Sequence, residues 1–209
     1  MRGMKMSKKG IIKTQYGDGI ENYQKRIKET IVKSLNTHPR TALIRLDLRF
    51  PGEDMFYRDD PAVITRFFKS LNERIPVYLK NKRKSGVRAH NTTLRYVWVR
   101  EFGKQGKHYH IALLVNKDTI HYMNAFQTDK GNFYTMIADS WLSALEINNI
   151  RKRCLVHLPL NCTYYLYKKD LINGDIDKVY EPIKSRMDYL IKVTQKKSDG
   201  ERNFGCSVK

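Results

Sequence analysis

The sequence predicts an α+β domain on three observations. The length of 209 residues and the 41% hydrophobic content suit one sizeable core. Segments whose apolar residues recur every three or four positions, as in amphipathic helices, are mixed with segments of period two, as in strands. Two strand-like segments are separated by Gly103-Lys104-Gln105-Gly106, which is typical of a hairpin between antiparallel neighbours.

The first elements are a helix, a strand and a second helix. Residues 20–36 predict an amphipathic helix with the apolar positions Ile20, Tyr23, Ile27, Ile31 and Leu35. Residues 42–50 predict a strand with one apolar face and one mostly charged face. After Asp59-Asp60-Pro61 a long helix is expected to run to about Leu79, and a basic loop should follow it.

The later elements have the same mixed character. Residues 93–102 and 108–116 predict the two hairpin strands, and residues 132–148 predict a helix. Short strands are expected over 154–160 and 163–168, before a last helix that begins near Pro182 and runs to about Lys197. We expect a basic N-terminal extension over 1–40, the main domain over 41–197 and a loose polar tail over 198–209.

Charge indicates the kind of partner. The chain has 40 Lys+Arg against 21 Asp+Glu, a net charge of +19, which predicts a polyanionic partner. Basic patches with tyrosines nearby fit single-stranded nucleic acid, because cations neutralise phosphates and aromatic rings stack on unpaired bases. A solvated basic surface or a membrane-surface binder is the alternative. No apolar run could span a bilayer and no secretory signal is recognisable, so we expect a cytoplasmic protein without a membrane partner.

A metal site is predicted on the hairpin. His108 and His110 are two apart on a strand and therefore share a face, while Tyr109 points to the other. If residues 102–107 form the connection, Glu101 lies opposite His108 and its carboxylate joins the two imidazoles. Nitrogen and oxygen ligands with open positions suit Mg²⁺ or Mn²⁺, with a substrate phosphate completing the shell. The alternative is two exposed histidines beside a turn.

The last helix carries a tyrosine on its basic side. At 100° per residue, Ile183, Met187, Leu190, Ile191 and Thr194 gather on one side, whereas Tyr189, Lys192 and Lys196 fall on the other. A phenol titrates near pH 10, so its attack on a phosphodiester needs a neighbouring cation and a metal at the phosphate. An exposed tyrosine on a basic face is the other interpretation.

In order along the chain, "LIRLDLRF", "HYHIALLVN" and "YLIK" resemble the motifs of the HUH endonucleases. Within that superfamily the likeness is closest to inovirus-type replication proteins, which initiate rolling-circle replication, and it spans about residues 42–197. The resemblance implies a central antiparallel sheet flanked by helices in the ferredoxin-like manner, with His108 and His110 on a middle strand. It also implies that Glu101 is the third metal ligand.

The resemblance implies a reaction as well. Tyr189 would attack a phosphate of single-stranded or hairpin origin DNA, become linked to the 5′ end and free a 3′ hydroxyl, and Lys192 would assist. No Walker-type loop appears, so a host helicase and polymerase are expected partners, without a small-molecule cofactor. We assign DNA contacts to Arg45, Arg49, Lys80, Lys82, Arg83, Lys84 and Lys196.

Several alternatives stay open. "YLYK" is a second Tyr-x-x-Lys, but it reads as a strand, where Tyr165 and Lys168 would face opposite sides. Asp47 could support a metal ligand or a DNA contact, or pair with Arg45 and Arg49. A non-catalytic single-strand or origin-binding protein and a relaxase or transposase of the same superfamily are the alternative functions.

Overall fold

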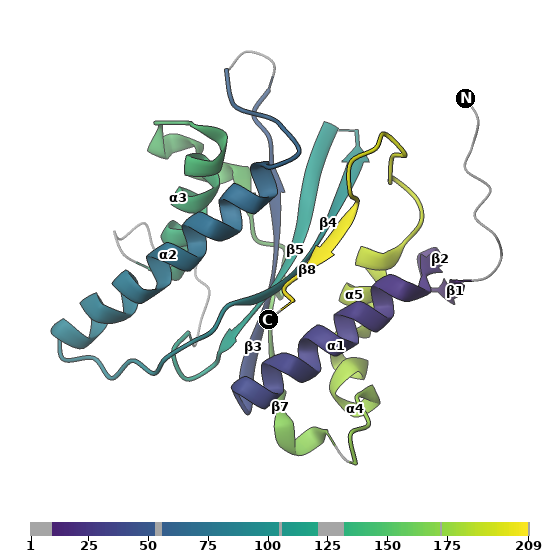
Figure 1. The fold of residues 1–209 in the computed structure, drawn as a ribbon, viewed down its shortest axis with the longest axis horizontal. Coiled ribbons are helices and arrows are strands. Elements are labelled where there is room, and N and C mark those ends of the chain that lie inside the picture. The colour runs from purple at the N-terminus through teal and green to yellow at the C-terminus, as the bar shows by residue number, and fades with distance from the viewer. Residues whose placement is uncertain (1–9, 53–55, 105, 121–131, 172, 209) are drawn as a thin grey trace.

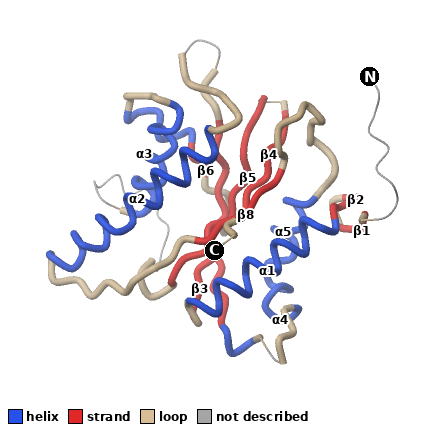
Figure 2. Tube along the Cα trace, in the orientation of Figure 1, coloured by secondary structure: helices blue, strands red, loops and turns tan. Residues whose placement is uncertain are grey.

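An antiparallel sheet with helices on both faces makes up the α+β fold (Figures 1 and 2). The computed structural model describes residues 10–52, 56–104, 106–120, 132–171 and 173–208. The strands are β1 (Ile11–Thr14), β2 (Gly17–Ile20), β3 (Arg40–Arg49), β4 (Arg95–Gly103), β5 (Gly106–Asn116), β6 (Val156–His157), β7 (Thr163–Tyr167) and β8 (Phe204–Cys206). The α-helices are α1 (Glu21–Thr37), α2 (Val63–Lys84), α3 (Phe133–Leu145), α4 (Asp177–Tyr180) and α5 (Lys184–Ile191). Among these helices none is long and apolar enough to cross a membrane.

The central strand of the main sheet is β5. The strand order is β6-β3-β5-β4-β8, and β7 pairs with the opposite end of β3 from β6. The predicted hairpin is confirmed, because β4 and β5 are antiparallel neighbours and Gly103 pairs with Gly106. Pairing on both sides fixes the register of β5, and with it the face on which each of its side chains lies.

Both faces of the sheet are covered by helices. Leu46, Tyr109 and Ile111 belong to one core with residues of α2 and α3. Leu43 and Leu114 point the other way, into a second core with residues of α1 and α5. The predicted charged face of β3 is therefore not a solvent face: Leu43 on it is buried in the second core, and its charged residues Arg45, Asp47 and Arg49 lie toward the β4–β5 turn.

Helix α2 is longer than the sequence predicted. It does not end near Leu79 but continues to Lys84 and contains Pro76. Ile75 and Leu79 are both buried on either side of this proline, and their packing offsets the backbone hydrogen bond that proline cannot donate. The basic residues expected in a loop therefore lie on the last turns of a helix.

The last helix is shorter than predicted. It ends at Ile191, and Lys192 has the extended backbone angles φ −53° and ψ 141°. Lys192 forms a bridge with Gly19, and the next amide, Val193, donates to Asp18 O at 2.8 Å. The β1–β2 hairpin, which periodicity did not predict, thus takes up the chain where the helix stops. Thr194 is exposed rather than on the buried stripe.

The C-terminal tail is ordered, so the prediction of a loose segment is wrong. Residues of β8 pair with β4, and the Phe204 ring stacks on Tyr23 with centroids 4.2 Å apart. The buried Arg100 guanidinium contacts Asp199 and Glu201, each at 2.5 Å. The polar composition of the tail gave no sign that Asp199 and Glu201 would pair with a buried charge.

The segment between α3 and β7 also differs from expectation. Residues 150–155 form a 3₁₀ helix, and only Val156 and His157 pair as strand β6. The second short strand is confirmed as β7. Although β6 is short, its pairing with Asp47 and Leu48 brings His157 beside the end of β3 that carries Asp47.

Candidate functional site

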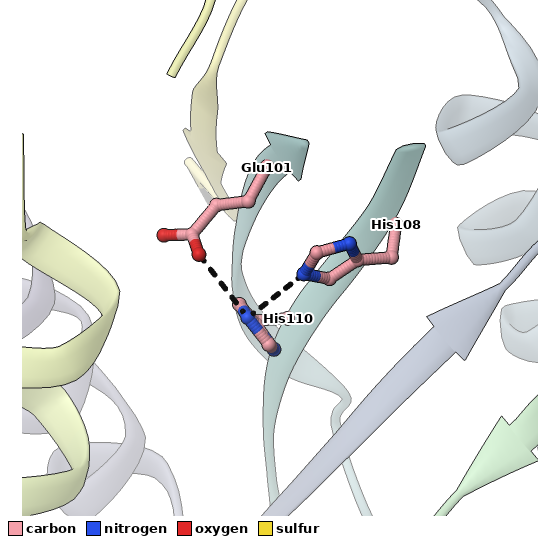
Figure 3. A group of neighbouring side chains, drawn as sticks. All are labelled: Glu101, His108 and His110. Carbon is pink, nitrogen blue, oxygen red and sulfur yellow. Dashed lines mark hydrogen bonds and ion pairs between the residues drawn. The ribbon is translucent and has the colours of Figure 1, made fainter. Parts of the chain in front are cut away.

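Three side chains of the β4–β5 hairpin converge at the polar end of the sheet (Figure 3). Glu101 pairs with His108 across the ladder, as the hairpin register predicted. His110 follows on the same face, so all three side chains point toward one another, while Tyr109 is buried in the opposite core. One ligand atom from each lies within 4.8 Å of the other two.

The hydrogen bonds of both imidazoles orient them as ligands. His110 Nδ1 lies 2.5 Å from Asp47 Oδ1, and His108 Nδ1 lies 3.1 Å from the carbonyl oxygen of Gly106. Since these oxygens only accept, each Nδ1 carries the hydrogen and each Nε2 presents a lone pair. The two Nε2 atoms are 3.2 Å apart, and Glu101 Oε2 is 3.3 Å from His110 Nε2. Three electron-pair donors at such distances are placed to share one cation.

These distances fit a metal ion. Two ligands bound at about 2.1 Å to one ion lie about 3.0–3.4 Å apart at octahedral or tetrahedral angles. Burial lowers the pKa of His108, which favours the neutral, ligating form, although the Gly106 bond opposes this shift. Glu101 Oε2 is buried without a hydrogen bond of good geometry, though Lys192 Nζ lies within ion-pair distance of it. The residues therefore suit a divalent cation.

Two lysines also pair with the Glu101 carboxylate. Lys192 Nζ is 2.9 Å from Oε2, and Lys196 Nζ is 3.1 Å from Oε1. Burial would raise the pKa of Glu101, but its contacts with His110, Lys192 and Lys196 outweigh the burial and lower the pKa to about 2. Lys196 also donates to the carbonyl oxygens of Leu190 and Lys192, so we withdraw the DNA contact predicted for it.

Asp47 supports the cluster from β3. Besides His110, its Oδ1 accepts a hydrogen bond from Arg45 Nη1 at 2.7 Å. Burial favours the neutral form of Asp47, yet the bonds from His110 and Arg45 prevail and hold its pKa well below the usual range. Arg45 is itself buried and also donates to backbone carbonyls, including Leu46 O. We therefore withdraw the DNA contact predicted for Arg45.

Tyr189 lies at the edge of the ligand cluster, the name we give to Glu101, His108 and His110. From α5, its half-buried ring contacts the His110 ring with centroids 5.2 Å apart. Lys192 Nζ lies 3.6 Å from the centroid of the same ring, although Lys192 is just beyond the helix. The structure thus brings the predicted phenol, lysine and metal ligands together.

A cleft of about 480 Å³ opens beside Tyr189, His108 and His110. It is lined by Asp47, Arg49, Phe50, Gly103, Lys104, Lys107, His108, His110, Cys154, Leu155, Tyr189 and Gln195. Arg49 is exposed here and pairs with His108 across the ladder, which suits a phosphate contact. A larger hollow of about 990 Å³ lies between α2 and α3, but the Asp139 and Arg153 charges in it pair with each other.

The other predicted DNA contacts lie far from this cleft. They are Lys80, Lys82, Arg83 and Lys84, on the last two turns of α2. That end of α2 is on the far left in Figure 1, whereas α5 is on the right. We call these four residues the distal basic cluster.

The alternative nucleophile does not reach the ligand cluster. Tyr165 lies on β7 opposite Ala42, five residues along β3 from Asp47. At about 3.3 Å per residue this separation is about 16 Å. The strand reading of "YLYK" is confirmed by β7, and Lys168 falls in the following 3₁₀ turn.

Sequence reasoning missed two neighbours of the site. His157 Nδ1 lies 3.5 Å from Asp47 Oδ2, and the Tyr16 ring contacts the Tyr189 ring with centroids 5.3 Å apart. Both come from short segments that reach the site through contacts distant in sequence, since β6 pairs with β3 and the β1–β2 hairpin bridges to Lys192 through Gly19. For Tyr16 the only local signal was the Gly17-Asp18-Gly19 turn chemistry after a short apolar run.

Comparison with known proteins identifies relatives along nearly the whole chain. The family model described as the YagK/YfjJ C-terminal domain matches residues 2–207. Protein YfjJ of Escherichia coli K12 is 35% identical over 205 residues, covering 93% of this chain and 97% of YfjJ. Protein YagK of the same strain is 34% identical over 201 residues, covering 92% of this chain and 95% of YagK.

One solved structure is a weak match. It is the N-terminal nuclease domain of non-structural protein 1 of minute virus of mice, with a TM-score of 0.31 and 10% identity. The match covers 72% of this chain and 79% of that chain. The viral domain is described as coordinating Zn²⁺ in its active-site pocket and recognising DNA at the origin of replication. A TM-score of this size does not establish a shared fold.

Proposed function

The chain belongs to the YagK/YfjJ C-terminal domain family, and we propose that it nicks and rejoins single-stranded DNA as an HUH-type endonuclease. The convergence of Glu101, His108 and His110 beside Tyr189 carries this proposal. Hard-cation ligands with room for a phosphate, next to a phenol and a lysine, are the groups that a phosphodiester transesterification requires.

The proposed reaction exchanges one phosphoester bond for another. A bond forms between Tyr189 Oη and phosphorus, and the bond from that phosphorus to the 3′ oxygen of the preceding nucleotide breaks. The phenol loses its proton to water in the cleft and the 3′ oxygen gains one, so the diester keeps its charge. Because the phosphotyrosine retains the energy of the broken ester, the 3′ hydroxyl can later attack it and restore the strand.

Glu101, His108 and His110 would hold Mg²⁺ or Mn²⁺. The bound ion would supply polarisation of the scissile phosphate oxygens. Asp47 keeps His110 in the tautomer that faces the ion. Lys192, close to both Glu101 and the Tyr189 ring, stabilises negative charge that develops on the phenol. Arg49 holds a neighbouring phosphate at the cleft rim.

The biological task we propose is initiation of rolling-circle replication of a phage or related mobile element. The freed 3′ hydroxyl would prime a host polymerase, and a host helicase would open the duplex. On this proposal residues 41–197 form the ferredoxin-like HUH domain. The N-terminal hairpin and α1 cover its second face, and β8 of the tail completes the edge beside β4.

A covalent adduct is the decisive observation. The protein is incubated with Mn²⁺ and a pool of labelled single-stranded oligonucleotides tiling the DNA on both sides of its coding sequence. We expect a labelled protein band that resists denaturation, and mass spectrometry should place the nucleotide on Tyr189. The band should vanish in Tyr189→Phe and His110→Ala and persist in Tyr165→Phe. Single-strand binding without any adduct would leave a non-catalytic DNA-binding protein.

A further inference from the structure

The β1–β2 hairpin presents an aromatic ring at its tip. Thr14 pairs with Gly17, which leaves Gln15 and Tyr16 as a two-residue loop. Thr14 Oγ1 accepts a hydrogen bond from the Tyr16 amide at 3.0 Å and donates to Gly17 O at 2.9 Å. Gly17 has φ +94°, which a residue with a side chain rarely adopts. The turn therefore holds Tyr16 in a defined position.

The hairpin is seated on the end of α5. Gly19 bridges to Lys192, and Val193 N donates to Asp18 O at 2.8 Å. A Cβ at Gly19 would lie 3.0 Å from Ile191 Cδ1, closer than van der Waals contact allows. This close approach fixes Tyr16 relative to the helix that carries Tyr189.

The Tyr16 ring lies beside Tyr189 and is accessible. It is 40% exposed and meets the Tyr189 ring edge-on, with centroids 5.3 Å apart. Its hydroxyl is 3.0 Å from Ser185 Oγ. The Tyr16 ring is held by its turn and by Ser185, yet it exposes this much surface beside the proposed nucleophile. Burial in a core therefore does not account for an aromatic residue at this position.

Tyr16 touches a lining residue of each of two hollows. Tyr189 lines the cleft over the metal ligands. Ser185 lines a second hollow of about 520 Å³ between the hairpin and α5, which is also lined by Lys13, Thr14, Gln15, Glu181, Lys184 and Asp188 and so carries as many acidic as basic side chains. A single DNA strand whose scissile phosphate lies in the cleft beside Tyr189 would pass the exposed Tyr16 ring.

We propose that Tyr16 is a stacking platform for one unpaired base next to the scissile phosphate. This inference rests on the proposed DNA-nicking function. Stacking on an aromatic ring tolerates any base, so the platform would fix the position of the strand more than its sequence. It would keep the phosphate within reach of Tyr189.

Tyr16 is not placed to be the nucleophile. Its hydroxyl contacts Ser185, whereas the Tyr189 ring contacts both Tyr16 and His110. The assigned role is therefore binding, and an adduct on Tyr16 in the mass-spectrometric assay would overturn it.

Binding without reaction tests the platform. All proteins carry Tyr189→Phe, and the probe is a fluorescein-labelled thymidine oligonucleotide of about 20 nucleotides, longer than common single-strand sites. Anisotropy should show that Tyr16→Ala and Tyr16→Leu weaken binding about fivefold or more, and fivefold is the lower end of the effect expected for the loss of one stacked base. Tyr16→Phe and Tyr16→Trp should stay within about twofold of the parent, because both keep a ring.

Controls separate stacking from packing and from charge. Tyr165→Ala removes a tyrosine that is 41% exposed on β7 and should bind like the parent. The slope of log affinity against log salt should not change in Tyr16→Leu, because no phosphate contact is lost. If Tyr16→Leu binds as tightly as the parent, the platform is wrong while the adduct assay still decides the nicking function. A parent protein that does not bind the oligonucleotide would overturn both.

Discussion

Asp47 fixes which nitrogen of His110 faces the proposed metal. Its carboxylate accepts the Nδ1 hydrogen at 2.5 Å and is itself held by Arg45. An amide at this position could present its NH₂ to Nδ1 and favour the wrong tautomer. Loss of a carboxylate that hydrogen-bonds a metal-binding histidine in this way typically lowers metal affinity by about 10–100-fold.

We therefore expect Asp47→Asn to weaken Mn²⁺ binding by about 10–100-fold, as measured by calorimetric titration. Asp139→Asn is the matched control, because Asp139 pairs with Arg153 away from the cleft. Its affinity for Mn²⁺ should equal that of the wild type. Equal affinity in Asp47→Asn would mean that Asp47 has no part in orienting His110.

Glu101 links the charge state of the site to stability. Its pKa is about 2 in the folded protein against 4.5 for an ordinary glutamate, since contacts with His110, Lys192 and Lys196 outweigh its burial. A lowered pKa means that the carboxylate stabilises the fold above pH 4.5 and that this stabilisation is lost as the pH falls toward 2. The shift corresponds to at most about 3 kcal/mol.

The test compares urea unfolding of the wild type and Glu101→Gln in chelator-treated buffer. Near neutral pH the wild type should have the larger free energy of unfolding. The difference should shrink as the pH drops from about 4.5 toward 2, by at most about 3 kcal/mol. A difference that is the same at all pH values would show that the carboxylate charge does not stabilise the fold.

At the residue scale, local rules predicted the ligand cluster but not its surroundings. A two-residue period and a short hairpin were enough to place Glu101 opposite His108. The second lysine on Glu101 was assigned to DNA, because a helix extended to Lys197 put Lys196 on a solvent face. Tyr16 and His157 approach through pairings with segments far away in sequence, and periodicity carries no information about such contacts.

At the element scale, the tail behaves as part of the sheet. Arg100 is 1% exposed, and Asp199 and Glu201 supply its counter-charges while β8 pairs with β4. Removing both carboxylates would leave a buried guanidinium without a charged partner. For fully buried pairs this costs about 3–5 kcal/mol, and the partial exposure of both acids reduces the expected cost to about 2 kcal/mol.

Asp199→Asn with Glu201→Gln should therefore lower the free energy of unfolding by about 2 kcal/mol in urea titrations. Adding Arg100→Met should restore most of it, because the buried charge is then absent as well. Arg100→Met in the otherwise unchanged chain is the matched control. No loss in the double variant would mean that strand pairing alone holds the tail.

The predicted ends of elements were wrong where contacts between elements decide them. Helix α5 stops at Ile191 because the next residues pair with the hairpin at Asp18 and Gly19. The helix pattern itself gave no stop signal before Lys197. By contrast, α1 and the three central strands β3, β4 and β5 were predicted well, since one strong period governs each of them over many residues.

At the scale of the whole molecule, mixed helix and strand periods predicted the α+β class, while strand order had to come from the structure. The edge strands β6 and β8 are too short to give a pattern. The net charge of +19 is likewise a property of the whole chain. It does not indicate which basic residues lie near the cleft, and the structure separates the distal basic cluster from it.

If the chain binds DNA as proposed, this separation would give the cleft and the distal basic cluster different parts in binding. The 22-residue α2 is about 33 Å long, and its basic end points away from α5. A short DNA strand bound in the cleft would not reach the distal basic cluster, whereas a long single DNA strand would. Phosphate contacts there would add salt-dependent affinity and leave the chemical step unchanged.

We expect the triple variant Lys80→Gln, Lys82→Gln and Lys84→Gln to bind a DNA strand of about 60 nucleotides with a shallower slope of log affinity against log salt. The slope should fall by about 2, because each of the three lost phosphate contacts contributes about 0.7. Binding of an oligonucleotide of about 10 nucleotides and the rate of adduct formation with it should not change. Arg83 stays in place because it bonds Ala89 O and Asn91, and arginine at the three lysine positions is the charge-preserving control. Equal losses on the short and the long strand would place the distal basic cluster at the cleft.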